Sequence, residues 1–468
     1  MNAVPAVADV IVVGAGCAGL CAAVEAAERG LSVIVCEKRG TSLESSTAAS
    51  GGYFAFIDTD LQRRDRIVDS DDTFRQDMER SGKGQSDPAL VDAYLKHQLD
   101  TYYWLQEHGI TFWDVDIGIG MNVPRCHATD SQRLLEVLMR SARRLGVSLC
   151  YHFPVGDIER DGSAFKVSGP DGLSLRAERA IILASGGFSR NPAMLGRFVP
   201  GLERLQIVDG GLGCMGDGIV MAEKLGASLS SMECVKPNFY SYALRDGTKE
   251  KMDRFHHDTP VGMVYHLGGI LVTSKGERYV REDMNAKDIA LVTLRLPDVM
   301  AWGIFDETVR QRAQTEKTIY INPAAMAKAV SAQTLPELAA LAGLPVDPFV
   351  RTVEQYNADC AAGAPDKMGR VHETALLGKP FALNAPPFYA FPTAPNQATT
   401  FGGVRVNPRT QIIDDKGDPL PGLYACGEIV GGFHGLNFVT GTALAQAAIF
   451  GRIAAKTIAR SAVAGAGS

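Results

Sequence analysis

Gly14, Gly16 and Gly19 lie in the stretch GAGCAG, which has the GxGxxG spacing of a nucleotide-binding turn. The first glycine allows a tight turn, the second lets the backbone approach a pyrophosphate, and the third lets a helix pack closely on a strand. Glu37 follows eighteen residues after Gly19, where a carboxylate can accept hydrogen bonds from a ribose. Because an acid there would repel a 2′-phosphate, the pattern favours FAD or NAD over NADP.

A second group of candidate residues lies near the C-terminus, in the stretch GGFHGLNFVTGTALAQ. The pattern predicts a glycine-rich loop that leads into an apolar helix. The centre of this loop, residues 437–441, carries no fixed charge, which is unusual for a loop that would face an acidic substrate. Glu428 precedes the loop, directly after the predicted strand in GLYACGE.

These residues need a sheet and helices to position them. The β-branched run 10–13 predicts a buried parallel strand, followed by a helix to about Arg29 and a second strand over 32–36. Residues 151–187 predict a strand meander that ends in a buried strand over 180–183. A nucleotide half-site completed by glycine loops about 400 residues later is typical of a flavoprotein that wraps FAD, rather than of an NAD dehydrogenase.

Composition excludes several classes of protein. The chain has 468 residues, a net charge of −6 and a pI near 5.9, so it has no basic footprint for nucleic acid. Its nine cysteines lack CxxC and CxxCH spacing, which argues against a disulfide framework, a metal site or an attached haem. The sequence has neither a signal-peptide pattern nor an apolar run of about 18 residues, so we expect a cytoplasmic protein without a transmembrane segment.

Motifs along nearly the whole chain resemble the soluble branch of the fumarate reductase/succinate dehydrogenase flavoprotein family, which also holds the 3-ketosteroid dehydrogenases. The motifs include VVGAGCAGL, STAASGG, IILASGGFSRNP, GDGIVMAEKLGA, GGILVTSKGERYVRED, FGGVRVNPRTQIID and GLYACGEIVGG. The resemblance implies an α/β fold with a Rossmann-like FAD-binding domain made of two chain segments, 1–232 and 385–468. It also implies an inserted α+β capping domain over 233–384 that serves the substrate.

The resemblance also implies which residues bind the cofactor. Those expected to contact FAD are Gly14, Gly16, Ala18, Gly19, Glu37, Lys38, Ser46, Thr47, Ser50, Gly51, Gly52, Val155, Ala184, Ser185, Gly186, Asp217, Gly427, Glu428, Thr442, Ala443 and Leu444. Ala443 and Leu444 begin the last helix, whose N-terminal amides would face the flavin. Membrane-bound members attach FAD covalently through a histidine, and here Ser45 or Ser46 takes that place, so we expect noncovalent FAD.

The predicted substrate residues depart from those of the fumarate reductases. The arginine after the loop asparagine is replaced by Phe438, a histidine by Thr399, and the arginine proton donor by Ala286 or Lys287. Because arginine is the residue that clamps carboxylates bidentately, fumarate is disfavoured. The stretch NFVTG resembles the NYVSG of the steroid enzymes instead, so Asn437, Phe438 and Tyr240 are candidate substrate contacts. Thr440 is the candidate catalytic hydroxyl, with Tyr265, His266 or Lys287 as a relay partner.

We therefore expect an FAD-dependent oxidoreductase that acts on CH–CH or C=C bonds next to a carbonyl. The most favoured reaction is dehydrogenation of a ketone-bearing cyclic or steroid-like substrate, with an external electron acceptor or donor. A first alternative is a reductase or dehydrogenase of di- or tricarboxylates that binds them through Lys236, Arg125 or Arg281. A second is an accessory electron-relay flavoprotein. Arg125 and His127 either approach the flavin or lie in a surface loop.

Overall fold

The computed structural model describes residues 6–243, 249–250, 258–259, 261–315, 320–321, 328–363, 365–371 and 380–465. The chain forms two compact units. Unit 1 comprises Met1–Met194, Gly210–Val235 and Thr399–Ser468, and unit 2 comprises Leu195–Asp209 and Lys236–Ala398. Unit 2 thus contains most of the predicted capping domain, together with residues 195–209 and 385–398. All the residues expected to contact FAD belong to unit 1.

Unit 1 is built on a mixed eight-stranded sheet whose main path has the order β20-β21-β9-β1-β2-β6. The pairs β1–β2, β2–β6, β1–β9 and β9–β21 are parallel, and Val10, Ile11 and Val12 are fully buried, as in sheets covered on both faces. The strands are β1 (Val7–Val13), β2 (Val33–Cys36), β6 (Ser148–Cys150), β7 (Asp157–Asp161), β8 (Ala164–Ser168), β9 (Ser174–Leu183), β20 (Gln411–Ile413) and β21 (Pro419–Ala425). The predicted meander is confirmed, because β7, β8 and β9 pair consecutively in antiparallel fashion.

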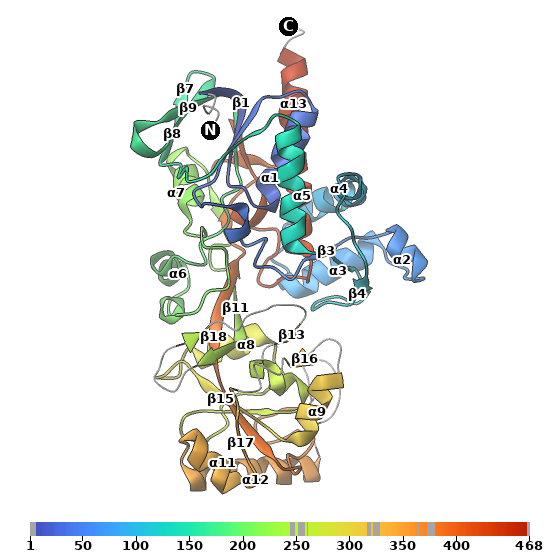
Figure 1. The fold of residues 1–468 in the computed structure, drawn as a ribbon, viewed down its shortest axis with the longest axis vertical. Helices are drawn as coiled ribbons and strands as arrows, with labels where there is room; N and C mark the ends of the chain where they lie inside the picture. The colour runs from blue at the N-terminus through green and yellow to red at the C-terminus, as the bar shows by residue number, and fades with distance from the viewer. Residues whose placement is uncertain are drawn as a thin grey trace. The chain divides into compact units, whose positions relative to one another are not determined.

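The helices of unit 1 include a packed group, α1, α5 and α13, which lie side by side (Figure 1). The helices are α1 (Cys17–Glu28), α2 (Asp60–Arg64), α3 (Asp71–Gly82), α4 (Pro88–Glu107), α5 (Ser131–Arg144), α7 (Asp217–Lys224) and α13 (Thr442–Gly465). Local capping explains where two of them begin. Asp130 accepts hydrogen bonds from the amides of Gln132 and Arg133 at the start of α5, and Asp87 accepts from Ala89 at the start of α4.

A small antiparallel sheet in unit 1 brings together segments that flank the predicted site. It has the order β3-β5-β4, with β3 (Tyr53–Ala55), β4 (Val115–Asp116) and β5 (Cys126–Ala128). β3 follows the paired glycines at 51–52, and β5 follows the loop that ends at Arg125. The backbone amide of Ala55 donates to the carbonyl of Gly441 at 3.1 Å, which ties β3 to the C-terminal loop. A further pair joins β10 (Leu229–Ser230) and β19 (Gly403–Val404).

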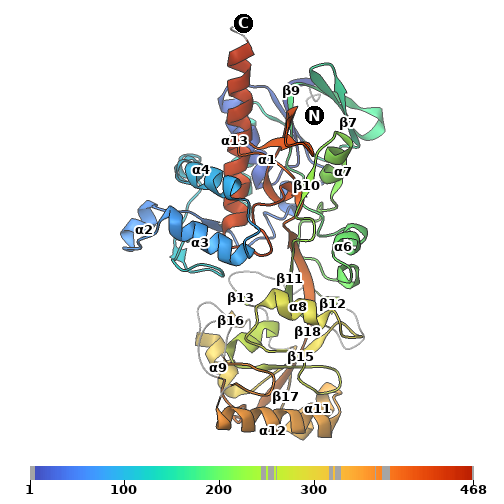
Figure 2. The same ribbon diagram turned by 180° about the vertical axis from the view of Figure 1, so that it is seen from behind.

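Unit 2 contains a six-stranded sheet with the main order β12-β11-β18-β15-β14, and β17 pairs with β18. Its strands are β11 (Val235–Ala243), β12 (Lys249–Glu250), β14 (Ile270–Val272), β15 (Ala301–Phe305), β17 (Val330–Ala332) and β18 (Phe388–Thr400). Its helices α8 (Ala286–Thr293), α9 (Glu307–Thr315), α11 (Leu335–Ala342) and α12 (Val346–Ala362) include the predicted helical stretch, and α11 and α12 lie together near β17 (Figure 2). The core combines Ile270, Ile304, Phe349 and Phe391, all fully buried.

The predicted fold class, α/β with parallel strands and packed helices, is confirmed. Among the helices of the described residues, none is long and apolar enough to cross a membrane.

Candidate functional site

The turn after β1 depends on two glycines for its own geometry. Gly14 has a φ of +109°, and a Cβ atom built on it would lie 2.4 Å from the carbonyl oxygen of Ala184. A Cβ atom on Gly19 would lie 2.0 Å from the carbonyl oxygen of Gly14. Both positions therefore require glycine for the close packing of β1, β9 and α1, as the GxGxxG spacing predicts.

Gly16 is different, because no contact with the described residues requires it to be glycine. It precedes α1 with a φ of −78°, and the nearest atom to a Cβ built there is the hydroxyl oxygen of Thr47, at 3.6 Å. The side chain of Ser45 lies on the same side, and its buried hydroxyl has no hydrogen-bond partner within the described structure. The same holds for the hydroxyl of Ser185, after β9. Room at the N-terminus of α1 beside the unpartnered Ser45 hydroxyl fits a bound pyrophosphate.

Glu37 lies directly after β2 and is half-buried. One carboxylate oxygen accepts a hydrogen bond from the Ala15 amide at 2.9 Å, and the other accepts from the Arg39 amide at 2.8 Å. These bonds aim the carboxylate at the turn, and each oxygen keeps capacity for a ribose hydroxyl. The next residue, Lys38, forms an ion pair with Asp217 at the start of α7, which brings two further predicted cofactor residues together.

Segments far apart in the sequence meet at Ser46 and Glu428. The Ser46 hydroxyl donates to the Glu428 carboxylate at 3.1 Å, and it accepts from the Gly211 amide at 3.0 Å. The other carboxylate oxygen of Glu428 accepts from the Thr399 hydroxyl at 2.5 Å. Burial, with a further contribution from the Glu428 charge, raises the pKa of the nearby Cys214 thiol to about 12, so Cys214 is a neutral thiol. Thr399 is thus held by the predicted cofactor acid.

The remaining predicted cofactor residues lie around the same turn. Thr47 caps α1 by accepting from the Cys17 amide at 3.0 Å, and the Ser50 hydroxyl donates to the Thr47 carbonyl at 2.7 Å. At the other end of the chain, the Thr442 hydroxyl donates to the Val439 carbonyl at 2.6 Å where α13 begins. The positions not otherwise described are Ala18 in α1, Gly51 and Gly52 before β3, half-buried Val155 before β7, Ala184 and Gly186 after β9, Gly427 after β21, and Ala443 and Leu444 in the first turn of α13.

The neutral loop 437–441 follows Glu428 and precedes α13. Asn437, Phe438 and Thr440 are all half-buried. The Asn437 side chain accepts from the Phe438 amide at 3.0 Å, and the Phe438 ring lies 5.9 Å from the ring of Phe401 and 6.5 Å from that of His434. An aromatic cluster of unit 1 therefore supports the ring at the position where fumarate reductases carry arginine.

The loop 118–122 also belongs to this site, although it was not predicted from the sequence. The carbonyl oxygen of Ile119 accepts from the Thr440 amide at 3.0 Å and from the Thr440 hydroxyl at 3.4 Å. A Cβ atom on Gly118 would lie 2.6 Å from the Cβ of Thr440. The glycines of GIGMN were the only signal in the sequence, since they allow this close approach.

Arg125 and His127 correct two expectations. Arg125 is fully buried, and its guanidinium donates to both oxygens of Asp69 at 2.8 Å and to Asp77 at 2.6 Å. Two internal carboxylates therefore hold it, so it does not lie in a surface loop, and its role toward a substrate acid stays a prediction. His127 is also fully buried, among Phe56, Phe112 and Tyr102, where burial lowers its pKa to about 4. It is a core histidine.

The predicted residues of unit 2 differ in their surroundings. Tyr265 is fully buried, its hydroxyl donates to the Phe239 carbonyl at 3.1 Å, and burial raises its pKa. His266 is half-buried beside it, and burial together with the charge of Arg370 lowers its pKa to about 4. Lys287 lies half-buried in the first turn of α8. The side chain of Tyr240 lies outside the described residues. The catalytic and substrate roles of all four stay predictions.

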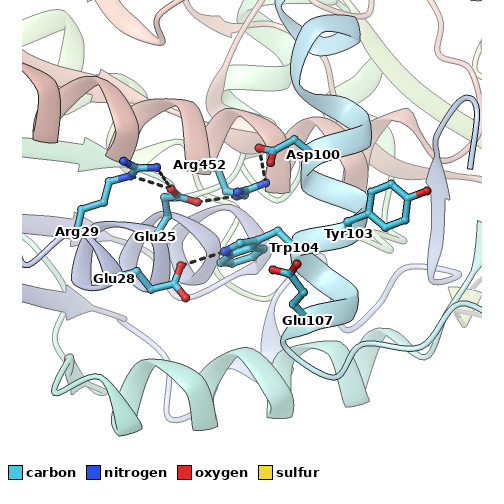
Figure 3. Close-up of a pocket in the computed structure, with 8 residues that line it drawn as sticks. All are labelled: Glu25, Glu28, Arg29, Asp100, Tyr103, Trp104, Glu107 and Arg452. Carbon is cyan, nitrogen blue, oxygen red and sulfur yellow. Dashed lines mark hydrogen bonds and ion pairs between the residues drawn. The ribbon is translucent and has the colours of Figure 1, made fainter.

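A hollow of about 440 Å³ opens between α1, α4 and α13 (Figure 3). Four of its charged groups are paired with one another, because Glu25 accepts from both Arg29 and Arg452, and Arg452 also pairs with Asp100. The indole of Trp104 donates to Glu28 at 2.9 Å. None of the predicted cofactor or substrate residues lines this hollow. The lining residues are Glu25, Glu28, Arg29, Asp100, Tyr103, Trp104, Glu107 and Arg452.

Comparison with known proteins supports the predicted resemblance. A family model described as "FAD binding domain" matches residues 9–444. The NADH:fumarate oxidoreductase of Klebsiella pneumoniae (strain 342) is 30% identical over 470 residues, which cover 98% of this chain and 48% of that protein. The chain thus spans about half the length of that relative. A probable fumarate reductase of Shewanella frigidimarina, Ifc3, is 28% identical over 97% of this chain and 75% of its own length.

Solved structures give the same picture. The open conformation of a flavocytochrome c3 fumarate reductase matches with a TM-score of 0.82 at 26% identity, covering 98% of this chain and 79% of that one. The 3-ketosteroid-Δ4-(5α)-dehydrogenase of Rhodococcus jostii RHA1, in complex with 4-androstene-3,17-dione, matches with a TM-score of 0.73 at 25% identity, covering 98% of both chains. The predicted similarity to both branches is confirmed.

Proposed function

Because the chain belongs to the FAD binding domain family, we propose that it is an FAD-dependent oxidoreductase acting on a C–C or C=C bond next to a ketone. The proteins that it resembles are reductases and dehydrogenases, which supports a redox function. We infer a neutral substrate from the residues of the loop 437–441. It offers a phenyl ring and a hydroxyl where a carboxylate clamp would need a cation.

FAD, when bound, supplies the site that takes or gives the hydride. Gly14, Gly16, Gly19, Glu37, Ser46 and Glu428 would hold it, and the N-terminus of α13 would stabilise negative charge on it. No histidine lies within residues 41–52, where covalent relatives attach FAD, so we propose noncovalent binding. The electron donor or acceptor would be a separate molecule.

Within the substrate site, Phe438 would pack on the carbon skeleton and Thr440 would take part in moving the proton on the carbon next to the ketone. Threonine is a weak base alone, so it needs a relay partner. Among the predicted partners, His266 has an imidazole that is neutral at pH 7, because burial and the charge of Arg370 lower its pKa to about 4, which also makes it a weak base. The Tyr265 hydroxyl is instead engaged with the Phe239 carbonyl.

A dicarboxylate substrate is the second candidate, favoured by the fumarate reductases among the similar proteins. The charges of the structure weaken it. The buried Arg125 guanidinium forms ion pairs with both Asp69 and Asp77, and Arg281 is paired with Asp283 at 2.9 Å.

Thr440→Val tests the proposal, because it keeps the shape of the side chain and removes the hydroxyl. The holoprotein is photoreduced and mixed anaerobically with 2-cyclohexen-1-one or with 4-androstene-3,17-dione, and the return of oxidised-flavin absorbance is followed. We expect normal FAD content and a rate lowered about 10²- to 10⁴-fold, the usual contribution of an acid–base group. Thr440→Ser keeps the hydroxyl and should stay near the wild-type rate. Equal rates in all three proteins would refute the role of Thr440.

A further inference from the structure

Asp77 of α3 is a fully buried carboxylate that the proposed chemistry does not use. It accepts hydrogen bonds from the Arg125 guanidinium at 2.6 Å, from the Arg80 guanidinium at 2.5 Å and from the Asn122 amide at 3.0 Å. Arg125 already has a bidentate partner in Asp69, which balances its charge. Balancing the charge of Arg125 therefore does not by itself explain why a carboxylate is buried at Asp77. Its other two hydrogen bonds connect it to different residues.

Both of those hydrogen bonds connect Asp77 to the loop 118–122, one directly and the other through Arg80. Asp77 binds the amide of Asn122 at one end of the loop, and Arg80 donates to the carbonyl oxygen of Gly120 at 2.8 Å in its middle. The loop closes on itself through a hydrogen bond from the Met121 amide to the Gly118 carbonyl at 3.2 Å. One carboxylate and one guanidinium thus fix the loop at two points.

The same loop fixes Thr440. The Ile119 carbonyl, directly before the fixed Gly120, is the acceptor for both the amide and the hydroxyl of Thr440. The contact is close on both sides, because a Cβ atom on Gly120 would lie 3.3 Å from the carbonyl oxygen of Phe438 and one on Gly118 would meet Thr440 at 2.6 Å. A shift of the loop would therefore move the Thr440 hydroxyl.

We infer that Asp77 and Arg80 are positioning residues that set the orientation of the Thr440 hydroxyl through the Ile119 carbonyl. The inference rests on the proposed function for the importance of that hydroxyl, and on the geometry alone for the coupling. The Asp77–Arg80 ion pair is only partly buried, and such a pair is weak evidence of a contribution to stability, because solvent screening at Arg80 and desolvation of Asp77 offset much of the attraction. Fixing the position of a reacting group gives such a pair a different role.

Arg80→Met tests the coupling with little risk to the fold, because the Arg80 side chain is 49% exposed. Arg75→Met is the matched control: Arg75 lies on the same helix, is 44% exposed, and pairs with Asp72 and Asp92 rather than with the loop. Asp77→Asn is a second variant that keeps the side-chain shape. Amide hydrogen exchange of the peptide containing Thr440 reports the coupling without a substrate, and reoxidation of the photoreduced holoprotein by 2-cyclohexen-1-one reports its effect on the reaction.

We expect Arg80→Met to speed exchange at the Thr440 peptide about tenfold, since a charge-assisted hydrogen bond is lost, and Arg75→Met to leave it unchanged. The reoxidation rate should fall about 10- to 100-fold in Arg80→Met, as for a misplaced reacting group. In a Thr440→Val background, Arg80→Met should cause no further loss of rate, because the two residues act through one hydroxyl.

Unchanged exchange in both Arg80→Met and Asp77→Asn would overturn the inference. The inference would also be overturned if Arg80→Met exchanged faster at the Thr440 peptide but kept a normal reoxidation rate while Thr440→Val was slow. The proposed function would survive that result. Faster exchange in Arg80→Met while Thr440→Val reacts normally, or while the wild-type protein fails to react, would uphold the coupling and refute the proposed function instead.

Discussion

Gly16 differs from the other two glycines of its turn in what a side chain would meet. The nearest atom of the described residues beyond its chain neighbours lies 3.6 Å from a Cβ atom on Gly16, whereas a Cβ atom on Gly19 would lie 2.0 Å from a backbone oxygen. We therefore expect Gly16→Ala to fold with a normal circular dichroism spectrum while its FAD content falls well below that of wild type, because the methyl group occupies the place of the pyrophosphate. Flavin absorbance per polypeptide gives the measurement.

Gly19→Ala is the contrasting variant. Its methyl group collides with the Gly14 carbonyl, so we expect a lower yield of folded protein whether or not FAD is supplied during refolding. If Gly16→Ala keeps its full complement of FAD, the pyrophosphate does not approach this residue and the assignment of the turn fails.

The small sheet β3-β5-β4 carries a pH-dependent contribution to stability through His127. Its folded pKa is lowered to about 4 by burial, and an unfolded histidine titrates near pH 6.5. Between pH 6.5 and about pH 4 the unfolded chain binds a proton at this histidine that the folded chain does not bind. The free energy of unfolding therefore falls as the pH falls through this window and is unaffected above it. The loss between pH 7.5 and pH 5 should be about 2 kcal/mol.

Urea unfolding of His127→Asn at both pH values tests this contribution. The variant should be less stable at pH 7.5, because the imidazole hydrogen bonds to Thr59 and to the Arg125 carbonyl are disturbed. It should nevertheless lose about 2 kcal/mol less than wild type on going to pH 5. His152→Asn, at an exposed position whose φ of +55° asparagine tolerates, is the control for the loss of a histidine outside the small sheet. An identical pH dependence in His127→Asn would contradict the burial argument.

Elements with a strong local pattern could be predicted from the sequence. The apolar run of β1, the alanine-rich α1 and the turn residues of the β7–β9 meander encode their structure locally, and the structure follows them closely. The contact between Ile119 and Thr440 could not be predicted, because it joins residues 321 positions apart through a backbone carbonyl that has no sequence signature. The burial of Arg125 was missed for the same reason, since neither Asp69 nor Asp77 is marked as its partner by spacing.

At the scale of the whole molecule, the two units divide the predicted roles. Unit 1 contains every residue expected to contact FAD and the neutral loop with Thr440. Unit 2 contains the predicted relay residues, with Tyr265 and His266 in a 3₁₀ helix (Val261–Leu267) and Lys287 in α8. The identity of the substrate therefore tests the proposed function, because a dicarboxylate requires cations in the substrate site and a neutral ketone does not.

The most direct measurement is the rate at which the photoreduced wild-type holoprotein is reoxidised anaerobically by 2-cyclohexen-1-one and by fumarate, compared at equal concentrations. We expect faster reoxidation by the neutral enone, because Phe438 and Thr440 offer no charge to a carboxylate and Arg125 is engaged with Asp69 and Asp77. Faster reoxidation by fumarate would contradict this expectation, and would assign the site to dicarboxylates.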